Sequence, residues 1–274
     1  MNQTLAPDPT PQRVAPAILP GRAVPRLAVR AIGKTYGGRR ALDGVSFEVR
    51  ENEFVALLGP SGAGKTTLIR CMAGLLEPDT GSVWVNGLDV AGLRGRARRH
   101  VALVFQQFNL VNRLSALDNV LAGRLGHVHP WRGWTRRFSR ADRLLALESL
   151  DRVGLLAHAS QRADTLSGGQ QQRVAIARAL TQQAEIIIAD EPIASLDPSI
   201  SSEILGLLRG ICRDQGVSVI CSLHQLHLAV SHADRLIGLV DGRVAVDLPA
   251  AEFDNSMADR LYSSVNTHFS GSTT

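Results

Sequence analysis

Residues 53–76, EFVALLGPSGAGKTTLIRCMAGLL, are the stretch that decides the fold of this chain. A short apolar run, residues 54–58, passes into a glycine-rich turn, and an apolar-periodic segment follows until Gly74 and Pro78. Residues 59–66 satisfy the pattern G-x-x-x-x-G-K-[ST], which binds phosphate when it stands between a strand and a helix. The stretch therefore predicts an α/β domain with a phosphate-binding loop at the end of a buried strand.

The residues of this loop fit a nucleoside triphosphate. Gly62 and Gly64 allow the backbone N–H groups to turn inward around a β-phosphate. Lys65 reaches the β and γ oxygens, and Thr66 presents its hydroxyl to Mg²⁺. The fixed positions of the pattern arise by chance in on the order of one chain in a hundred of this length. The sequence therefore predicts binding of a nucleoside triphosphate.

The alternation of strand and helix patterns around this stretch predicts a parallel sheet with crossover helices. A hairpin is predicted over residues 234–249, with Asp241-Gly242 as its turn. Helical periodicity between about residues 112 and 165 predicts a helical insertion into the α/β body. The predicted strands are 27–32, 45–49, 53–59, 82–90, 100–105, 185–190 and 217–223, and a further helix is predicted over 199–216.

Polar residues follow two of the predicted strands at their carboxyl ends, where ligands bind in open α/β folds. Asp190 is suited to hold the Mg²⁺ shell, and Glu191 beside it is suited to orient or deprotonate a water aimed at the γ-phosphorus. Solvated surface charge is the alternative for this pair. His224 ends another apolar run and either donates to the γ-phosphate or serves as a packing or capping residue.

Two further candidates have less specific signals. Gln106 follows residues 100–105 and is a candidate contact for the metal or the attacking water, although Gln107 beside it fits equally well. Tyr36 precedes two glycines, and its ring either stacks on adenine, a contact worth roughly 1–3 kcal/mol, or packs in the core.

The segment LSGGQQQRVAIARAL, residues 166–180, predicts a helix that opens on a serine and two glycines. Glycine costs about 1 kcal/mol in a helix interior, so this bare first turn indicates close approach to the backbone. The free N–H groups and the positive dipole end at a helix start favour an anion there. The alternative is an ordinary N-cap at Ser167, with the glycines filling a tight turn.

The composition of the 274 residues, 45% of them hydrophobic, is that of a chain with one or two globular domains. Residues 1–26 carry half of the 12 prolines and predict a disordered extension. No apolar run approaches the roughly 18–20 residues that span a bilayer. The cysteines Cys71, Cys212 and Cys221 form no CxxC pair and fit reduced thiols in a cytoplasmic protein.

The net charge of +5 comes largely from arginine clusters at residues 94–100 and 131–140. Such clusters bind nucleic acid, anionic lipid headgroups or an acidic partner, or they form a solvated face. No aromatic residues are interleaved at regular spacing, and only 4% of the residues are aromatic. Because a stacking platform for single strands needs such residues, we predict no nucleic-acid partner.

The ordered set TYGG, GPSGAGKTT, FQQ, LSGGQQQR, IIIADEP, ASLD and SLHQ resembles the ATP-binding cassette (ABC) ATPases. The resemblance implies a P-loop NTPase fold with a RecA-like parallel sheet core, an antiparallel β subdomain and a helical subdomain insertion. It implies an ATPase domain over residues 27–248, with the helical subdomain at about 107–168 and a C-terminal tail over 249–274.

The resemblance also assigns roles to individual residues. It implies that Tyr36 stacks on adenine, that Gln106 contacts the metal and the attacking water, and that Asp190 is a metal ligand. It implies that Glu191, His224, Lys65 and Gln106 are catalytic, and that Thr66 is a further metal ligand for Mg²⁺. The residues implied to bind ATP are Tyr36, Gly59, Pro60, Ser61, Gly62, Ala63, Gly64, Lys65, Thr66, Thr67, Ser167, Gly168, Gly169, Gln170 and Asp197.

The same resemblance implies partners. In the family, two ATPase subunits face each other head to tail, and the LSGGQ helix of one caps the γ-phosphate bound by the other, so a bare surface is expected at residues 167–169. Transmembrane permease subunits would contact the helical insertion and the glutamine loop, with a periplasmic substrate-binding protein acting indirectly. The expected location is the cytoplasmic face of the inner membrane, as a peripheral subunit.

Longer matches resemble the phosphonate-import ATPases in particular. They include the stretches 105–126, 129–143, 161–180 and 190–198, of which the tryptophan- and arginine-rich segment is unusual among relatives for phosphate, amino acids or metals. His227, where an acidic residue is expected, departs from the pattern. The alternatives are an importer of phosphate, phosphite or another oxyanion, and a soluble ABC ATPase that acts on nucleic acid or ribosomes.

Overall fold

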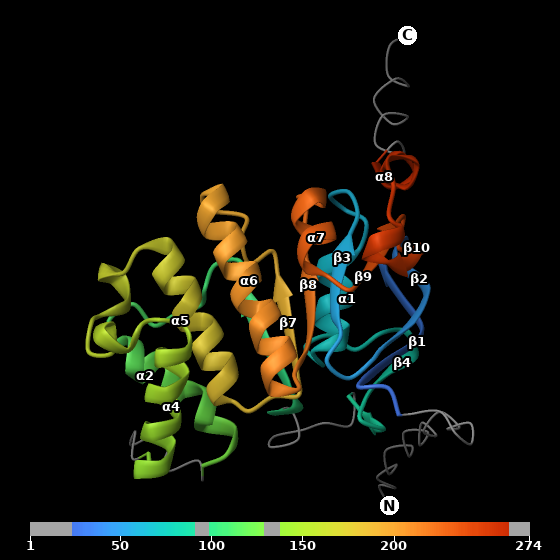
Figure 1. The fold of residues 1–274 in the computed structure, drawn as a ribbon. Coiled ribbons are helices and arrows are strands. Elements are labelled where there is room, and N and C mark those ends of the chain that lie inside the picture. Colours follow the sequence, from blue (N-terminus) through green and yellow to red (C-terminus); the bar gives the residue numbers. More distant parts are fainter. Residues whose placement is uncertain (1–23, 91–98, 129–137, 263–274) are drawn as a thin grey trace, which may run out of the picture.

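The computed structural model describes residues 24–90, 99–128 and 138–262, and its centre is a six-stranded sheet in the order β10-β9-β3-β8-β7-β6 (Figure 1). The five strands from β9 to β6 are parallel, and β10 pairs with β9 in antiparallel fashion. The strands are β3 (Phe54–Leu58), β6 (Val101–Phe105), β7 (Ile186–Asp190), β8 (Ser218–Ser222), β9 (Arg235–Val240) and β10 (Arg243–Pro249).

The central strands are apolar because both faces of the sheet are covered. In β3, Phe54, Ala56 and Leu58 belong to one core cluster, whereas Val55 and Leu57 belong to a second cluster on the opposite face. All five residues of β3 are buried. The sheet therefore separates two hydrophobic cores, and the loop that follows β3 emerges at its carboxyl edge.

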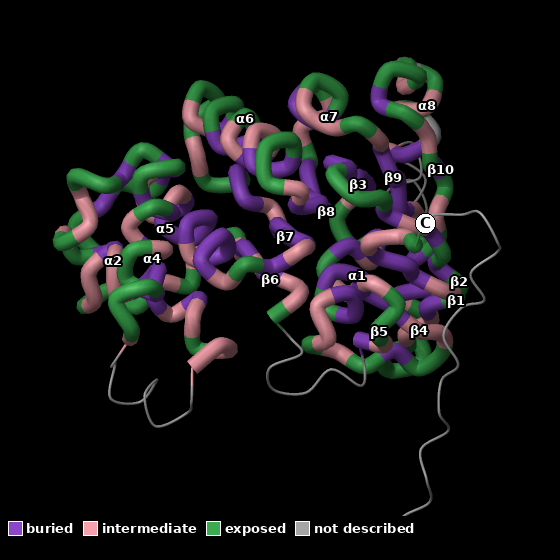
Figure 2. Tube along the Cα trace, turned by 60° about the horizontal axis from the view of Figure 1, so that its bottom comes forward, coloured by how far each residue is buried: buried purple, intermediate pink, exposed green. Residues whose placement is uncertain are grey.

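Figure 2 shows the layers on the two sides of the six-stranded sheet. Helices α6 (Pro198–Gln215), α7 (Leu226–His232) and α8 (Asn255–Tyr262) lie on one side, and α1 (Lys65–Met72) lies on the other. A four-stranded antiparallel sheet lies on the side of α1, with the order β2-β1-β4-β5. Its strands are β1 (Leu27–Tyr36), β2 (Arg39–Val49), β4 (Thr80–Val85) and β5 (Leu88–Asp89). These features confirm the predicted combination of parallel core and antiparallel β part.

The helical part lies beyond the β6 edge of the sheet (Figure 1). It consists of α2 (Ala116–Leu121), the 3-10 turn η2 (Ala122–Gly126), α4 (Arg140–Arg152), two short 3-10 turns, η3 (Leu156–His158) and η4 (Ala163–Thr165), and α5 (Gly168–Thr181). Ala146 and Leu150 of α4 share a core cluster with Phe54 of β3. The helical part is thus packed onto the sheet through one continuous core.

The chain continues beyond the predicted domain end into η5 (Ala250–Glu252) and α8. Leu261 of α8 is fully buried against Gly238 of β9, where an added Cβ would lie 2.3 Å from Leu261 Cδ2. The predicted proline-rich extension (1–26), apart from its last three residues, and most of both arginine clusters lie outside the described residues.

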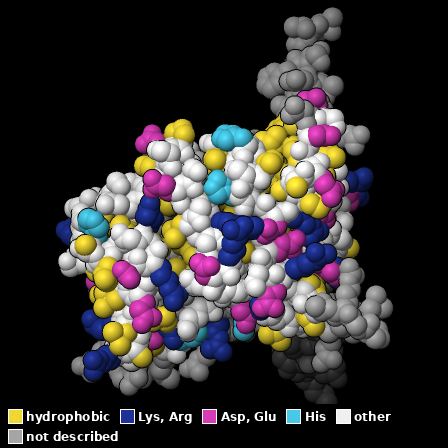
Figure 3. Space-filling view, in the orientation of Figure 1, with side chains coloured by type: hydrophobic (Ala, Val, Ile, Leu, Met, Phe, Trp, Pro, Cys, Tyr) yellow, Lys and Arg dark blue, Asp and Glu magenta, His cyan; other side chains and the backbone are white. Residues whose placement is uncertain are grey.

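None of the helices in the described ranges is both long and apolar enough to cross a bilayer. On the face in Figure 3, basic and acidic side chains are interspersed instead of being segregated by sign. All three cysteines are buried and unpaired, and burial raises the pKa of the Cys71 and Cys212 thiols to about 11.

Candidate functional site

The phosphate loop, residues 59–64, connects β3 to α1 and depends on its glycines for its course. Gly59, Gly62 and Gly64 have φ values of 140°, 82° and 101°, a region that residues with a Cβ adopt at a cost. Gly64 has a second constraint, because an added Cβ would lie 2.4 Å from the carbonyl oxygen of Ala41. The glycine pattern that predicts the loop thus has a conformational cause.

Lys65, the first residue of α1, points back into this loop. Its Nζ donates to the carbonyl oxygens of Gly59 at 2.7 Å and Pro60 at 3.1 Å, and the side chain is buried. Burial lowers the pKa of Lys65, and the carboxylates of Glu191 and Asp190 oppose that shift. Because an ammonium group has three donors, one N–H remains to meet an anion in the loop.

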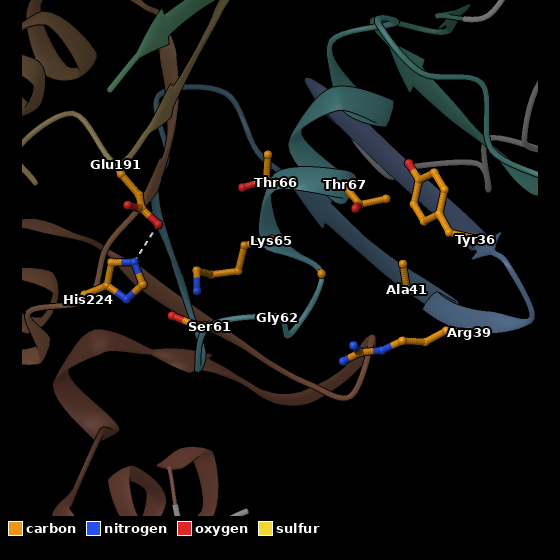
Figure 4. Close-up of a pocket in the computed structure, with 11 residues that line it drawn as sticks. Tyr36, Arg39, Ala41, Ser61, Gly62, Lys65, Thr66, Thr67, Glu191 and His224 are labelled. Carbon is orange, nitrogen blue, oxygen red and sulfur yellow. Dashed lines mark hydrogen bonds and ion pairs between the residues drawn. The ribbon is translucent and has the colours of Figure 1, made fainter. Parts of the chain in front are cut away.

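A pocket of about 360 Å³ opens over the loop (Figure 4). It brings residues from β1, β2, the loop and α1 together with two residues that follow β7 and β8. In Figure 4, Tyr36 and Glu191 lie at opposite ends of the pocket with Lys65 between them. The lining residues are Tyr36, Arg39, Ala41, Ser61, Gly62, Gly64, Lys65, Thr66, Thr67, Glu191 and His224.

The acidic end of the pocket is formed by Glu191, which follows β7, and His224, which follows β8. Nε2 of His224 donates to Oε1 of Glu191 over 2.5 Å. Ser222, the last residue of β8, donates through Oγ to Oδ1 of Asp190 at 2.9 Å. The parallel pairing of β7 with β8 places their carboxyl ends side by side and so assembles these four residues from two distant segments.

Other predicted site residues lie outside this pocket. Gln106 is exposed in a turn after β6 and does not line it. Ser167, Gly168 and Gln170 at the start of α5 do not line it either, nor does Asp197, the exposed N-cap of α6. Figure 1 shows α5 separated from α1 by the strands of the sheet. Within one chain, the phosphate loop and the LSGGQ segment therefore belong to different surfaces.

The start of α5 is a capping box centred on Ser167. The backbone N–H of Gln170 donates to Ser167 Oγ, and the N–H of Ser167 donates to Gln170 Oε1 at 2.9 Å. Ser167 and Gly168 are exposed. The N-cap that the sequence left as the alternative is thus present, and the exposed residues beside it still form an open helix start.

The prediction of a bare surface was wrong for Gly169. This residue is buried, and a Cβ added to it would lie 2.8 Å from Cγ2 of Ile200 in α6. Close packing of α5 against α6 therefore explains the missing side chain at Gly169 within a single chain.

The sequence did not identify Arg39 and Ser222 as site residues. Arg39 lines the pocket, and its guanidinium lies near the phosphate loop, 3.8 Å from an ideal Cβ built on Gly62. The arginine pair of TYGGRR just after Tyr36 was a usable signal for Arg39. Ser222 had none, because a serine at the end of a buried strand has many other uses.

The fold and the pocket define the class of P-loop ATPases: a glycine-rich loop between a buried strand and a helix, a buried lysine, and a carboxylate-histidine pair facing them. The family model described as ABC transporter matches residues 42–194. The chain belongs to the ABC transporter family and is an ATPase of that family, as its motifs predict.

Relatives and solved structures agree with this assignment. The chain is 51% identical to the phosphonates import ATP-binding protein of Frankia casuarinae, over 84% of this chain and 94% of that protein. It is 49% identical to the hypophosphite import ATP-binding protein of Stutzerimonas stutzeri, over 86% of this chain and 70% of that protein. A dimeric, post-hydrolysis ATP-binding cassette bound to ADP and Pi is 35% identical, with a TM-score of 0.71 over 83% of this chain and all of that one.

Proposed function

We propose that this chain is the ATP-hydrolysing subunit of an importer that energises uptake of phosphonates across the inner membrane. The observation that carries the ATPase part is the pocket in which Lys65, Glu191 and His224 converge over the phosphate loop. The phosphonate assignment is supported by the 51% identical relative, which is named for phosphonate import.

Four side chains of the pocket and the N–H groups of the loop have a chemical task in this proposal. Tyr36 stacks on adenine, Lys65 and the loop N–H groups hold the β- and γ-phosphates, and Glu191 accepts a proton from the water that attacks the γ-phosphorus. His224 holds the Glu191 carboxylate through the hydrogen bond from Nε2, and its imidazole lies at the end of the pocket where the γ-phosphate would bind.

Thr66 and Asp190 are the proposed protein ligands of Mg²⁺, with Gln106 as a further contact. In the described part of the chain, no three His, Cys, Asp or Glu side chains cluster as a metal site. The hydroxyl of Thr66 and the carboxylate of Asp190 fit Mg²⁺, because this ion is usually held by one or two protein oxygens together with phosphates and waters. When bound, the ion neutralises charge that develops on the phosphate oxygens.

A second copy of the chain completes the site in this proposal. Four predicted residues lie outside the pocket of their own chain: Ser167, Gly168, Gln170 and Asp197. In a head-to-tail dimer, each chain would present these residues to the γ-phosphate bound by the other chain. The 35% identical cassette is a dimer, which supports this arrangement. Transmembrane permease subunits at the cytoplasmic face of the inner membrane, and indirectly a periplasmic binding protein, are the further proposed partners.

Glu191→Gln tests the catalytic assignment. Glutamine keeps the shape of the side chain but cannot accept the proton, so we expect hydrolysis to fall by roughly two to four orders of magnitude while ATP binding persists. The same variant with ATP should elute as a dimer in gel filtration. Glu148→Gln, an exposed glutamate of α4, is the matched control and should hydrolyse ATP normally. Undiminished turnover in Glu191→Gln would remove Glu191 from its role.

Hypophosphite is the second candidate substrate, because a 49% identical relative is named for its import. Reconstitution of the chain with its permease and binding protein in vesicles, followed by ATP-driven uptake of alkylphosphonate, hypophosphite, phosphite and phosphate, separates the two. We expect alkylphosphonate to be taken up fastest. Preferential uptake of hypophosphite or phosphate would overturn the phosphonate assignment and leave the ATPase assignment standing.

A further inference from the structure

The hydroxyl of Ser222 lies between two residues of the proposed catalytic centre. Ser222 Oγ donates to Oδ1 of Asp190 at 2.9 Å and accepts from the backbone N–H of Glu191 at 2.8 Å. The side chain is fully buried, so water does not compete for these bonds. One hydroxyl thus contacts two consecutive residues at the end of β7, and Ser222 itself does not line the pocket.

These two bonds constrain different parts of the site. The first occupies one oxygen of Asp190 and fixes the rotation of its carboxylate, so that the other oxygen has a defined direction. The second holds the backbone of Glu191, whose φ of 49° is in the left-handed region that a residue with a long side chain rarely adopts. This backbone conformation directs the Glu191 side chain, whose Oε1 accepts from His224.

We infer that Ser222 is a positioning residue that sets the direction of the Asp190 carboxylate and the backbone of Glu191 through a single shared hydroxyl. The inference rests on the proposed roles of these two residues in ATP hydrolysis. Ser222 touches no reacting atom; it acts through its neighbours, as residues that orient metal ligands and catalytic carboxylates do.

The two hydrogen bonds of Ser222 explain why this position needs a hydroxyl group. The position needs one group that donates to a carboxylate and accepts from an N–H within a small buried volume. Alanine supplies neither function, and the thiol of cysteine is a weak donor and acceptor. Threonine retains the hydroxyl and adds only a methyl group.

The experiment compares Ser222→Ala with Ser218→Ala in the full chain. Ser218 is the matched control because it is also a fully buried serine of β8, at the opposite end of the strand, and its Oγ donates to the carbonyl oxygen of Arg50 at 2.8 Å. Both variants lose a buried hydroxyl of the same size. We expect Ser222→Ala to lower kcat by about 10–100-fold and Ser218→Ala to leave it within about twofold.

A second readout separates positioning from a general loss of structure. ATP affinity is measured with and without Mg²⁺ for Ser222→Ala and Ser218→Ala, each in the Glu191→Gln background, where hydrolysis is blocked. We expect Ser222→Ala to bind metal-free ATP normally and to lose most of the gain that Mg²⁺ gives, because Asp190 has lost its orientation. An unchanged Mg²⁺ gain together with equal kcat in both serine variants would overturn the inference.

Ser222→Thr completes the test and protects it against misfolding. If Ser222→Ala does not fold, Ser222→Thr and Ser222→Cys are compared instead: recovery of kcat in threonine but not in cysteine supports the inference, and equal activity in both contradicts it. If the wild-type chain hydrolyses no ATP, the proposed function fails. If the wild type is active and Ser222→Ala matches it, only the inference about Ser222 fails.

Discussion

Tyr36 is a site residue whose proposed role is contact with the nucleotide base, and it makes few contacts within the protein. Tyr36 is about half exposed at the end of β1, with Lys34 Nζ 5.9 Å from the ring centroid. We therefore expect Tyr36→Ala to leave the melting temperature without nucleotide almost unchanged. Stacking on a base contributes roughly 1–3 kcal/mol, so ATP should bind about 10–100-fold more weakly.

Fluorescence titration with ATP, ADP and GTP checks this prediction, with Tyr36→Trp as the control. Tryptophan retains an aromatic face, so its affinity for ATP should stay close to that of the wild type. GTP affinity should fall with ATP affinity in Tyr36→Ala, because stacking tolerates either purine. Equal ATP affinity in the alanine variant and the wild type would show that Tyr36 does not contact the base.

Residues of the site were predictable where their chemistry depends on neighbours in sequence. Lys65 lies in the pocket because the conformational freedom of the glycines fixes the loop before it, and the helix begins directly after Gly64. Ser222 was not predictable in this way, because its partner Asp190 is 32 residues away in the sequence and only the pairing of two strands brings them together. Arg39 likewise depends on how the antiparallel sheet lies against the loop.

The junction of α5 and α6 offers a test of why Gly169 has no side chain. Gly169→Ala places a methyl group 2.8 Å from Ile200 Cγ2, so we expect a loss of about 1–3 kcal/mol in unfolding free energy. Removing that contact in Gly169→Ala/Ile200→Ala should restore much of the loss. Urea unfolding of both single variants and the double variant measures the coupling as a double-mutant cycle.

The ATPase rate of the same variants separates packing from ligand contact. Recovery of hydrolysis in the double variant means that Gly169 serves the packing of α5 on α6. A double variant that folds and stays inactive would instead mean that Gly169 must admit a phosphate. Gly206→Ala is the control for adding a methyl group without a clash, because Gly206 is an exposed residue of α6 and nothing lies within 4 Å of a Cβ built on it.

Secondary elements followed the sequence most closely where one strong local signal defined them. The hairpin formed by β9 and β10 turns at Asp241-Gly242, as predicted, because both residues adopt positive φ there. The order of the strands and the docking of α8 on β9 had no such signal. Both depend on which buried faces match in three dimensions, as the contact of Leu261 with Gly238 shows.

The molecule as a whole is organised around two cores that share one sheet. The larger core includes residues of α4 and α5 as well as of β3, α6 and α8, so the helical part has no separate core of its own. The nucleotide pocket is at the carboxyl edge of this sheet, beside residues that follow β3, β7 and β8. A change that loosens the helical part is therefore expected to lower the stability of the entire described domain.

The ion pair of Arg124 with Asp142 joins η2 to α4 within the helical part. We use it to predict how the stability of the domain depends on pH. Arg124 Nε donates to Asp142 Oδ1 at 2.8 Å, and both side chains are nearly buried. Burial by itself raises the pKa of Asp142, but hydrogen bonds from Ser139 and Arg124 outweigh it, so the pKa lies below the usual 3.8. A depressed folded-state pKa adds stability above the unfolded value, and this contribution disappears as the pH falls through the folded value.

Asp142→Asn should therefore cost most at neutral pH and little in acid. The substitution leaves the nearly buried guanidinium of Arg124 without its counter-charge. Breaking a fully buried pair costs about 3–5 kcal/mol. Because both side chains keep some exposure, we expect a loss of about 2–3 kcal/mol at pH 7, or roughly 5–10 °C in melting temperature for a domain of this size. The carboxyl of the unfolded chain takes up its proton near pH 4, and that of the folded chain does so only at lower pH because its pKa is depressed. The difference between the two proteins should therefore shrink as the pH falls below about 4. Urea unfolding of both proteins from pH 7 downward measures this difference in stability.

Asp151→Asn is the control, at an exposed position of the same helix, and it should change stability by less than about 0.5 kcal/mol at every pH. A loss in Asp142→Asn that stays constant down to pH 3 would mean that side-chain shape, and not the charge of the carboxylate, stabilises this junction.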